Sequence, residues 1–213
     1  MNRRTIAISA MLVLVTTVLV GGPVAAKADR QTVAVVWHPQ SGLAGPVGDG
    51  AGATVVRRPN GVSLNFRTTR LQPGHAYTLW FIVLNEPSAC AATPCSAPDI
   101  LLNPATEAQI TRAAGHVVGA GGNGAFASAF RVGALDGWLS GGELTNPLTA
   151  EIQLVLNDHG PVLAGYLPDM IHTYRAGCTD ASLPAIFPAS AKADGAPGPN
   201  TCLLYQAAVF TGS

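Results

Sequence analysis

The stretch His75-Ala-Tyr-Thr-Leu-Trp-Phe-Ile-Val-Leu-Asn85 decides the fold, because it is apolar at nearly every position. A strand sends successive side chains to opposite faces of its sheet, so a run of this kind is typical of a strand buried on both faces. The residues Leu71-Gln72-Pro73-Gly74 precede it, with Pro and Gly well placed for a turn. We therefore predict a central strand over residues 75–85.

The residues before this strand have the pattern of a β-hairpin. Two runs rich in β-branched residues, 53–57 and 62–69, flank Pro59-Asn60-Gly61. Asn-Gly between two such runs is a strong short-range turn signal. Apolar and polar residues alternate in the second run, which indicates one buried face. The arginines around the hairpin are predicted to lie on a solvated strand face: Arg57, Arg58, Arg67 and Arg70.

Strand patterns recur over the rest of the chain, between frequent Gly and Pro residues. Five further runs have them: 32–37, 115–119, 124–131, 150–156 and 203–210. Short helical turns are predicted over residues 106–112 and 168–175. The fold class is therefore all-β, and we predict an antiparallel β-sandwich, Ig-like or Greek-key, of roughly eight strands. Residues 181–200, rich in Ala, Pro and Gly, are predicted to form a long irregular C-terminal loop.

The first 28 residues have the pattern of a secretory signal peptide. Arg3 and Arg4 give a positive start, and residues 5–20 are almost wholly apolar. That run is shorter than the roughly 20 residues of a membrane-spanning helix. Small residues suit a signal peptidase, so we predict cleavage after Ala28, with cleavage after Ala26 as the alternative. The mature chain is then expected to be secreted, extracellular or periplasmic, without stable membrane insertion.

The remaining residues, 29–213, have the length of a single domain with its own core. Without Arg3, Arg4 and Lys27, nine basic residues stand against twelve acidic ones, so the net charge is about −3. Nothing in this balance resembles the clustered basic face that binds nucleic acid. An extracellular protein or a glycan is the class of partner that remains.

Four cysteines in a chain predicted to be exported favour disulfides. Three pairings are compatible with the count. We favour Cys90–Cys95, which closes a short loop, and Cys178–Cys202, which ties residues 181–200 back to the chain. A zinc–thiolate site is the alternative, and export argues against it.

A histidine-based metal site is the sharpest chemical hypothesis, because imidazole is a common ligand for copper and zinc. The five histidines lack the close spacing of a local chelate, so only the fold can bring them together. The candidate ligands are His159, His116 and His75, with Asp158 beside the first as a ligand or an orienting carboxylate. Without such a site, no cofactor is predicted.

Catalytic motifs are not evident. The chain has no Gly-x-Ser-x-Gly elbow and no phosphate-binding loop. Trp138 lies in the glycine-rich stretch 135–142 and is a candidate binding residue, or else a plug over one end of the sandwich. Trp80 lies within the most apolar strand and is predicted to belong to the core.

Several segments together resemble an uncharacterised family of exported bacterial β proteins: residues 71–80, 85–90, 115–117, 158–161 and 202–210. His159-Gly160-Pro161 is also similar to part of a His-x-His-Gly-Pro stretch of chordin-type (CHRD) domains. Here Asp158 precedes the histidine and the second histidine of that stretch is missing. The resemblance implies an exported β protein and no established activity. We expect a binding or scaffolding protein rather than an enzyme. The alternative is a histidine-based metalloprotein that binds copper or zinc and has redox activity as one of its possible roles.

Overall fold

The computed structural model describes residues 28–137 and 142–212, so the predicted signal peptide and Trp138 lie outside the described residues. Within them the chain is mostly β-strand, which confirms the all-β class. Sheet A has the strand order β1-β3-β4-β7, and all its pairs are antiparallel. Its strands are β1 Asp29–Ala34, β3 Gly52–Arg58, β4 Gly61–Thr68 and β7 Gly124–Arg131.

Sheet B has the order β2-β11-β10-β5-β6 and is also antiparallel throughout. Its strands are β2 Val36–Trp37, β5 His75–Leu84, β6 Ala108–Val117, β10 Glu151–Pro161 and β11 Leu203–Phe210. A small third sheet pairs β8 Gly133–Ala134 with β9 Glu143–Leu144. The predicted strand over residues 75–85 is confirmed as β5, which lies between β10 and β6.

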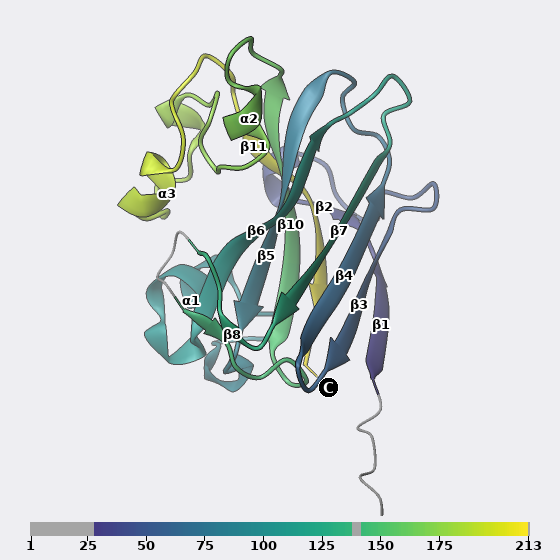
Figure 1. The fold of residues 1–213 in the computed structure, drawn as a ribbon, viewed down its shortest axis with the longest axis vertical. Coiled ribbons are helices and arrows are strands. Elements are labelled where there is room, and N and C mark those ends of the chain that lie inside the picture. Colours follow the sequence, from purple (N-terminus) through teal and green to yellow (C-terminus); the bar gives the residue numbers. More distant parts are fainter. Residues whose placement is uncertain (1–27, 138–141, 213) are drawn as a thin grey trace, which may run out of the picture.

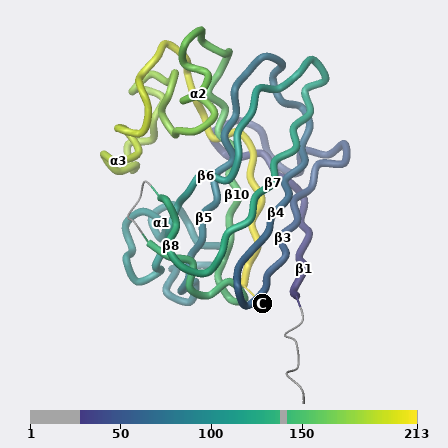
Figure 2. Tube along the Cα trace, viewed as in Figure 1, coloured from purple at the N-terminus to yellow at the C-terminus, as the bar shows by residue number. Residues whose placement is uncertain are grey.

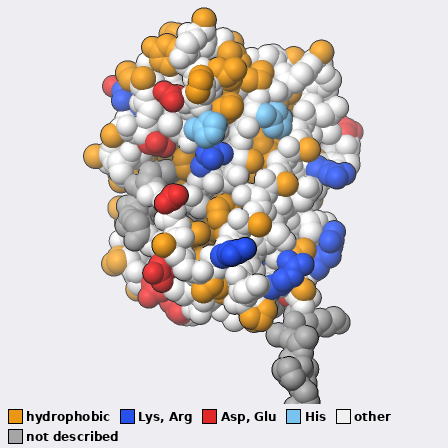
Figure 3. All heavy atoms as spheres, viewed as in Figure 1, with side chains coloured by type: hydrophobic (Ala, Val, Ile, Leu, Met, Phe, Trp, Pro, Cys, Tyr) orange, Lys and Arg blue, Asp and Glu red, His pale blue; other side chains and the backbone are white. Residues whose placement is uncertain are grey.

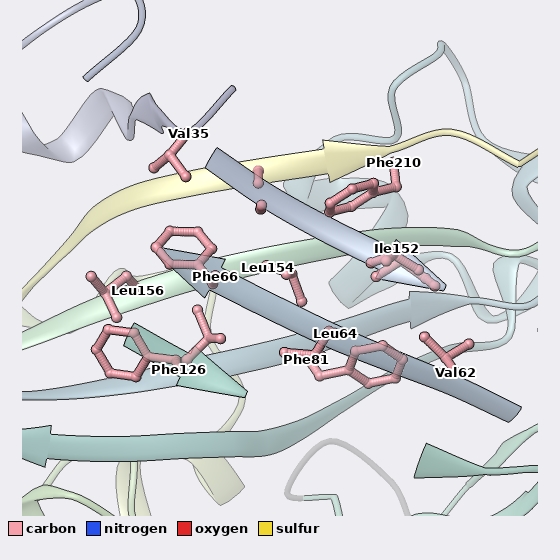
Figure 4. Packing of buried hydrophobic residues seen from close by; sticks show 14 of the residues in the cluster. Val35, Val62, Leu64, Phe66, Phe81, Phe126, Ile152, Leu154, Leu156 and Phe210 are labelled. Atoms are coloured by element: carbon pink, nitrogen blue, oxygen red, sulfur yellow. The ribbon is translucent and has the colours of Figure 1, made fainter. Parts of the chain in front are cut away.

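The inner faces of sheets A and B share one hydrophobic core (Figures 1 and 4). Phe81 of β5 stacks on Phe130 of β7 with ring centroids 4.3 Å apart, and Phe66 meets Phe126 edge to face. Figure 4 shows apolar side chains of β4 and β7 facing those of β10 across this layer. The apolar residues that alternate with polar ones in the second strand of the hairpin thus form part of the inner face of sheet A.

Residues 32–37, predicted to be one strand, are divided between the two sheets. β1 pairs with β3 in sheet A, whereas β2 pairs with β11 in sheet B. The chain crosses at Val35, which is fully buried and whose carbonyl accepts a hydrogen bond from the Val47 amide. A continuous apolar run therefore hides a change of sheet, because both strands bury apolar side chains in the same core.

The predicted hairpin is confirmed, with β3 and β4 paired from Arg58↔Gly61 onward. Gly61 has φ 149°, and an added Cβ would lie 2.1 Å from the Phe130 carbonyl oxygen of β7. Glycine is therefore required here both by the backbone angle and by the close approach of a neighbouring strand.

Arg57 overturns the prediction of a solvated strand face, because its side chain is fully buried. Its guanidinium donates to the carbonyl oxygens of Pro147 (3.0 Å), Ala150 (2.7 Å) and Phe210 (3.3 Å). Burial lowers its pKa, opposed by the nearby charge of Asp29. Alternation explains the position, since Arg57 follows Ala53 and Val55 on the inner face of β3. Arg58, Arg67 and Arg70 are exposed, as predicted.

The helix predicted over residues 106–112 is wrong. These residues end the 3-10 turn η3 (Pro104–Thr106) and begin β6, which pairs with β5 along its whole length. The residues have the local composition of a helix, but as a strand their backbone groups form a continuous series of hydrogen bonds with the central strand β5. The second predicted helical turn, over residues 168–175, is confirmed in part, since the helix Leu167–Met170 covers only its first three residues.

Two lobes cover the outer face of sheet B (Figures 1 and 2). The first lobe is residues 86–107 and the second lobe is residues 162–202. Figure 2 shows the second lobe, in green and yellow, beside the same sheet but away from the first. The helices and 3-10 turns are η1 Pro39–Ser41, η2 Pro87–Ala89, α1 Ala97–Leu102, η3 Pro104–Thr106, α2 Leu167–Met170, η4 Asp180–Ser182 and α3 Ala189–Ala193.

Each lobe carries one disulfide, Cys90–Cys95 in the first and Cys178–Cys202 in the second. Both predicted pairings are confirmed. All four cysteines are used in these disulfides, so none is left as a thiolate for a zinc site. The residues predicted as an irregular C-terminal loop form much of the second lobe. None of the helices in the described part of the chain has the length and apolar character needed to span a membrane.

Candidate functional site

A pocket with a volume of about 140 Å³ lies on the outer face of sheet B, between the two lobes. The sheet supplies its floor with apolar side chains from four strands: Trp80, Ile82, Ile110, Val155 and Leu204. These residues face outward because their neighbours on the same strands, such as Phe81 and Leu154, face the inner core. Because β5 is apolar on both faces, one face contributes to the core between the sheets and the other to the floor of the pocket.

The walls of the pocket come from the lobes. Ala97, Ile100 and Leu101 of α1 form one wall, and Tyr174 and Phe187 of the second lobe form the other. The lining is mostly apolar and opens partly to solvent. Such an apolar concavity with a few polar groups is the usual form of a small-molecule site.

The wall from α1 is fixed by the start of that helix. Asp99 accepts hydrogen bonds from the backbone amide (2.8 Å) and hydroxyl (2.6 Å) of Ser96, as in a capping box, and from the Ala91 amide (3.0 Å). These donors lower the pKa of Asp99, those from Ser96 first. The cap therefore holds Ile100 and Leu101 over the sheet and ties α1 to the loop closed by Cys90–Cys95.

The opposite wall is aromatic. Tyr174 meets Trp80 of the floor edge to face, with centroids 5.7 Å apart, and meets Phe187 in the same manner at 5.1 Å. Edge-to-face contacts of this kind stabilise a ring cluster beyond the burial of its area. Burial raises the pKa of Tyr174, so its hydroxyl stays neutral over the physiological range.

The outward side chains of β10 explain why the pocket lies between the lobes. Glu151 and Gln153 bond the first lobe, while Asn157 and His159 bond the second. All four are buried. Val155, between the two pairs, bonds to neither lobe and is part of the floor. One strand thus anchors both walls and leaves the gap between them.

Gln153 is a buried polar residue of the lining and comes from the floor, with 8% of its surface exposed. Its Nε2 donates to the Cys95 carbonyl (2.9 Å) and to Oε1 of Glu151 (2.7 Å). Because both acceptors fix which end carries the nitrogen, the amide orientation is determined. Among the described residues no donor reaches Gln153 Oε1, which leaves an acceptor in a side chain that lines the pocket.

His38 is the second polar side chain of the lining. Its Nδ1 accepts from the Gln40 amide at 3.2 Å and caps η1. Burial lowers its pKa, so the ring is neutral at pH 7 and carries its proton on Nε2. His38 thus adds a polar group to the pocket without adding a charge.

His159, the first predicted metal ligand, is fully buried and has both ring nitrogens engaged. Nε2 accepts from the Thr78 hydroxyl (2.9 Å) and from Nδ2 of Asn157 (3.1 Å), so Nδ1 carries the proton and donates to the Ala176 carbonyl (3.0 Å). Burial lowers the pKa of His159 to about 4. Its lone pair is therefore used inside the protein, to hold the second lobe on the sheet.

His75 and Asp158 are brought together, at the inner face of sheet B. His75 Nδ1 lies 3.0 Å from the Asp158 carboxylate, which also accepts from the Tyr77 hydroxyl (2.9 Å) and the Gly160 amide (2.7 Å). Burial raises the pKa of Tyr77, and the Asp158 carboxylate raises it further. The cluster joins the start of β5 to the end of β10.

His116 stacks instead on Phe126 of β7, with centroids 4.4 Å apart, and burial lowers its pKa. The structure therefore does not assemble the four predicted ligands into one site. Within the described ranges, one group of three metal-ligating side chains is close enough to share an ion: His159, Cys178 and Cys202. The two cysteines are a disulfide, so that group offers no thiolate.

Sequence reasoning missed the pocket and its polar residue. Trp80 is buried in a hydrophobic cluster, as predicted. That cluster lies between sheet B and the lobes and not between the two sheets. The alternation along residues 150–156 could have pointed to Gln153, because it places the polar residues Glu151 and Gln153 together on one face of the strand. Trp138, the predicted binding residue, lies outside the described residues.

No family model, curated protein or solved structure matches the chain. The pocket is therefore the feature of the molecule that bears on function.

Proposed function

We propose that the protein is an exported, non-catalytic binding protein that holds a small apolar ligand in the pocket between the lobes. The observation that carries this proposal is the concave apolar lining of about 140 Å³ on the outer face of sheet B. Protein interiors are close-packed, with few voids larger than a water molecule. Two separately anchored walls around an apolar gap are better explained as a ligand site than as a packing fault.

Binding rather than reaction is supported by the lining residues. Its described polar side chains are His38, Gln153 and Tyr174, and these supply no nucleophile next to a base. The His75–Asp158 pair has the geometry of an oriented base, but it is not part of the pocket. A protein or glycan partner, the wider prediction from composition, is compatible with this site but is not required by it.

Export is supported by the two disulfides, which persist in oxidising compartments and are rare in the cytosol. The predicted signal peptide gives the same direction. We propose a secreted protein, extracellular or periplasmic, whose β1 begins at Asp29, next to the predicted cleavage after Ala28.

The test is binding of one-ring apolar molecules to the disulfide-bonded protein, measured by calorimetry and by the shift in melting temperature. Ala97 is exposed and lines the pocket, so Ala97→Leu fills the space with little change to the core. Ala125→Leu, on the exposed outer face of sheet A, is the matched control.

We expect fluorobenzene to bind the wild type and Ala125→Leu equally, and Ala97→Leu at least about tenfold more weakly, since filled space excludes the ring. Absence of binding by the whole set of one-ring molecules would overturn the proposal. Equal binding by all three proteins would place the ligand elsewhere.

The histidine-based copper or zinc site remains a prediction and is not advanced as a second function. Only His75 and Asp158 of its four residues lie together. The metal content of protein purified without a histidine tag or chelator is the measurement that decides it.

A further inference from the structure

The size of the pocket limits its occupant to about one ring. An apolar cavity of roughly 150 Å³ in another protein stays dry and takes up benzene, whereas drug-sized ligands need about 300 Å³ or more. The pocket here has about 140 Å³. A fused or long-chain ligand would have to displace a wall that is held by buried hydrogen bonds, or else extend through the opening into solvent.

The aromatic residues favour a flat ring over an aliphatic one. Trp80, Tyr174 and Phe187 already form a chain of edge-to-face contacts around the space. All three rings line the pocket, and aromatic rings pack on one another more favourably than their area alone predicts, so a flat ring fits this lining better than an aliphatic one.

Gln153 sets the polarity of the ligand. Both hydrogens of its amide are engaged by Cys95 and Glu151, so the group cannot turn over to present a donor. Its oxygen is the atom left for a ligand, in a side chain that is more than nine-tenths buried. An acceptor that has no described protein donor and belongs to a lining side chain disfavours a ligand that offers only another acceptor.

We infer that the pocket takes a single aromatic ring bearing one hydrogen-bond donor, of the phenol or aniline class, with the donor bonded to Gln153 Oε1. This inference rests on the proposed function, because it concerns the same pocket. It assigns Gln153 as the residue that determines specificity.

Phenol and fluorobenzene test the inference on the unaltered protein, since the two have nearly the same shape and only phenol donates a hydrogen bond. A purely apolar pocket binds phenol more weakly, because the hydroxyl loses its water. With an acceptor in place, we expect phenol to bind about three- to tenfold more tightly, the effect of one net hydrogen bond.

The outcomes separate the two proposals. Tighter binding of fluorobenzene than of phenol would overturn the role of Gln153 and leave the pocket as an apolar site. Binding of neither would overturn the proposed function itself.

A second measurement avoids a Gln153 variant, which would also unpair Cys95 and Glu151. In nuclear magnetic resonance spectra, phenol should shift the Gln153 side-chain amide signals, with a smaller change for fluorobenzene. Equal shifts for both molecules would contradict a hydrogen bond to this side chain.

Discussion

The outer faces of the two sheets differ although the sheets share one core. On sheet A the outward positions are short or charged, and Thr54, Asn65 and Arg67 remain at least partly exposed. On sheet B the outward positions include Trp80 and Val155, which are buried under the lobes. Figure 3 shows basic side chains over the sheet A side and most acidic ones over the lobe side. The outer face of sheet A is therefore solvated, whereas the apolar outer face of sheet B has to be covered by the two lobes.

The inner face of sheet A gives the largest expected effect. Arg57→Met should destabilise the protein by about 4 kcal/mol, because a buried cation and its bonds to three carbonyls are lost. Arg67→Met, on the exposed outer face, should change stability by less than about 0.5 kcal/mol. Urea unfolding of both variants measures the difference, and similar losses would show that burial of Arg57 is not important.

The second lobe depends on its disulfide. Cys178 and Cys202 are 24 residues apart, and the loop-entropy model assigns about 3.5 kcal/mol to their bond. The double serine variant should lose about that much stability and also ligand binding, since it releases the wall that carries Tyr174. The matched variant of Cys90 and Cys95, which are 5 residues apart, should lose about 2 kcal/mol. A reversed order would contradict this account of the second lobe.

Acid should weaken the attachment of the second lobe through His159. Its pKa is about 4 in the folded protein and about 6.5 when unfolded. Below pH 6.5 the unfolded chain binds the proton first, so stability is lost as the pH falls toward 4, by about 3 kcal/mol from this residue.

His159→Gln is the control, because glutamine keeps a donor and an acceptor but does not titrate. It should be less stable at pH 7, and its stability should fall less between pH 7 and pH 4. Parallel pH curves for the two proteins would rule out His159 as the group responsible.

The two outer faces can be compared by one substitution that keeps the side-chain shape. Val155→Thr places a hydroxyl under the lobes and should destabilise the protein by about 1–2 kcal/mol. Val56→Thr places it on the half-exposed face of sheet A, where we expect less than about 0.5 kcal/mol. Thermal unfolding of the pair measures it, and equal changes would mean that both faces are solvated alike.

The inner core was predictable from sequence, because its signal is local. The alternation in β4 and the apolar run of β5 each specify buried faces without reference to distant residues. Residues 106–112 were mispredicted because the ladder with β5, which is formed with residues far along the chain, outweighs their local preference.

The site was not predictable for a related reason. Glu151, Gln153, Asn157 and His159 have the alternation of a solvated strand face, and polar residues there normally meet water. In the structure they meet backbone groups of lobes whose positions depend on the disulfides and on long-range contacts. Arg57 shows the same effect on sheet A, where the partners of a charged residue come from sheet B and the loop before β10.

The most direct test of the central claim, that the outer face of sheet B is the binding face, is a titration of the ¹⁵N-labelled protein with phenol. We expect shifted signals at the Trp80 indole, in α1 and around Phe187, with β3 and β4 of sheet A unchanged. Shifts confined to sheet A, or none at phenol concentrations up to the millimolar range, would contradict it.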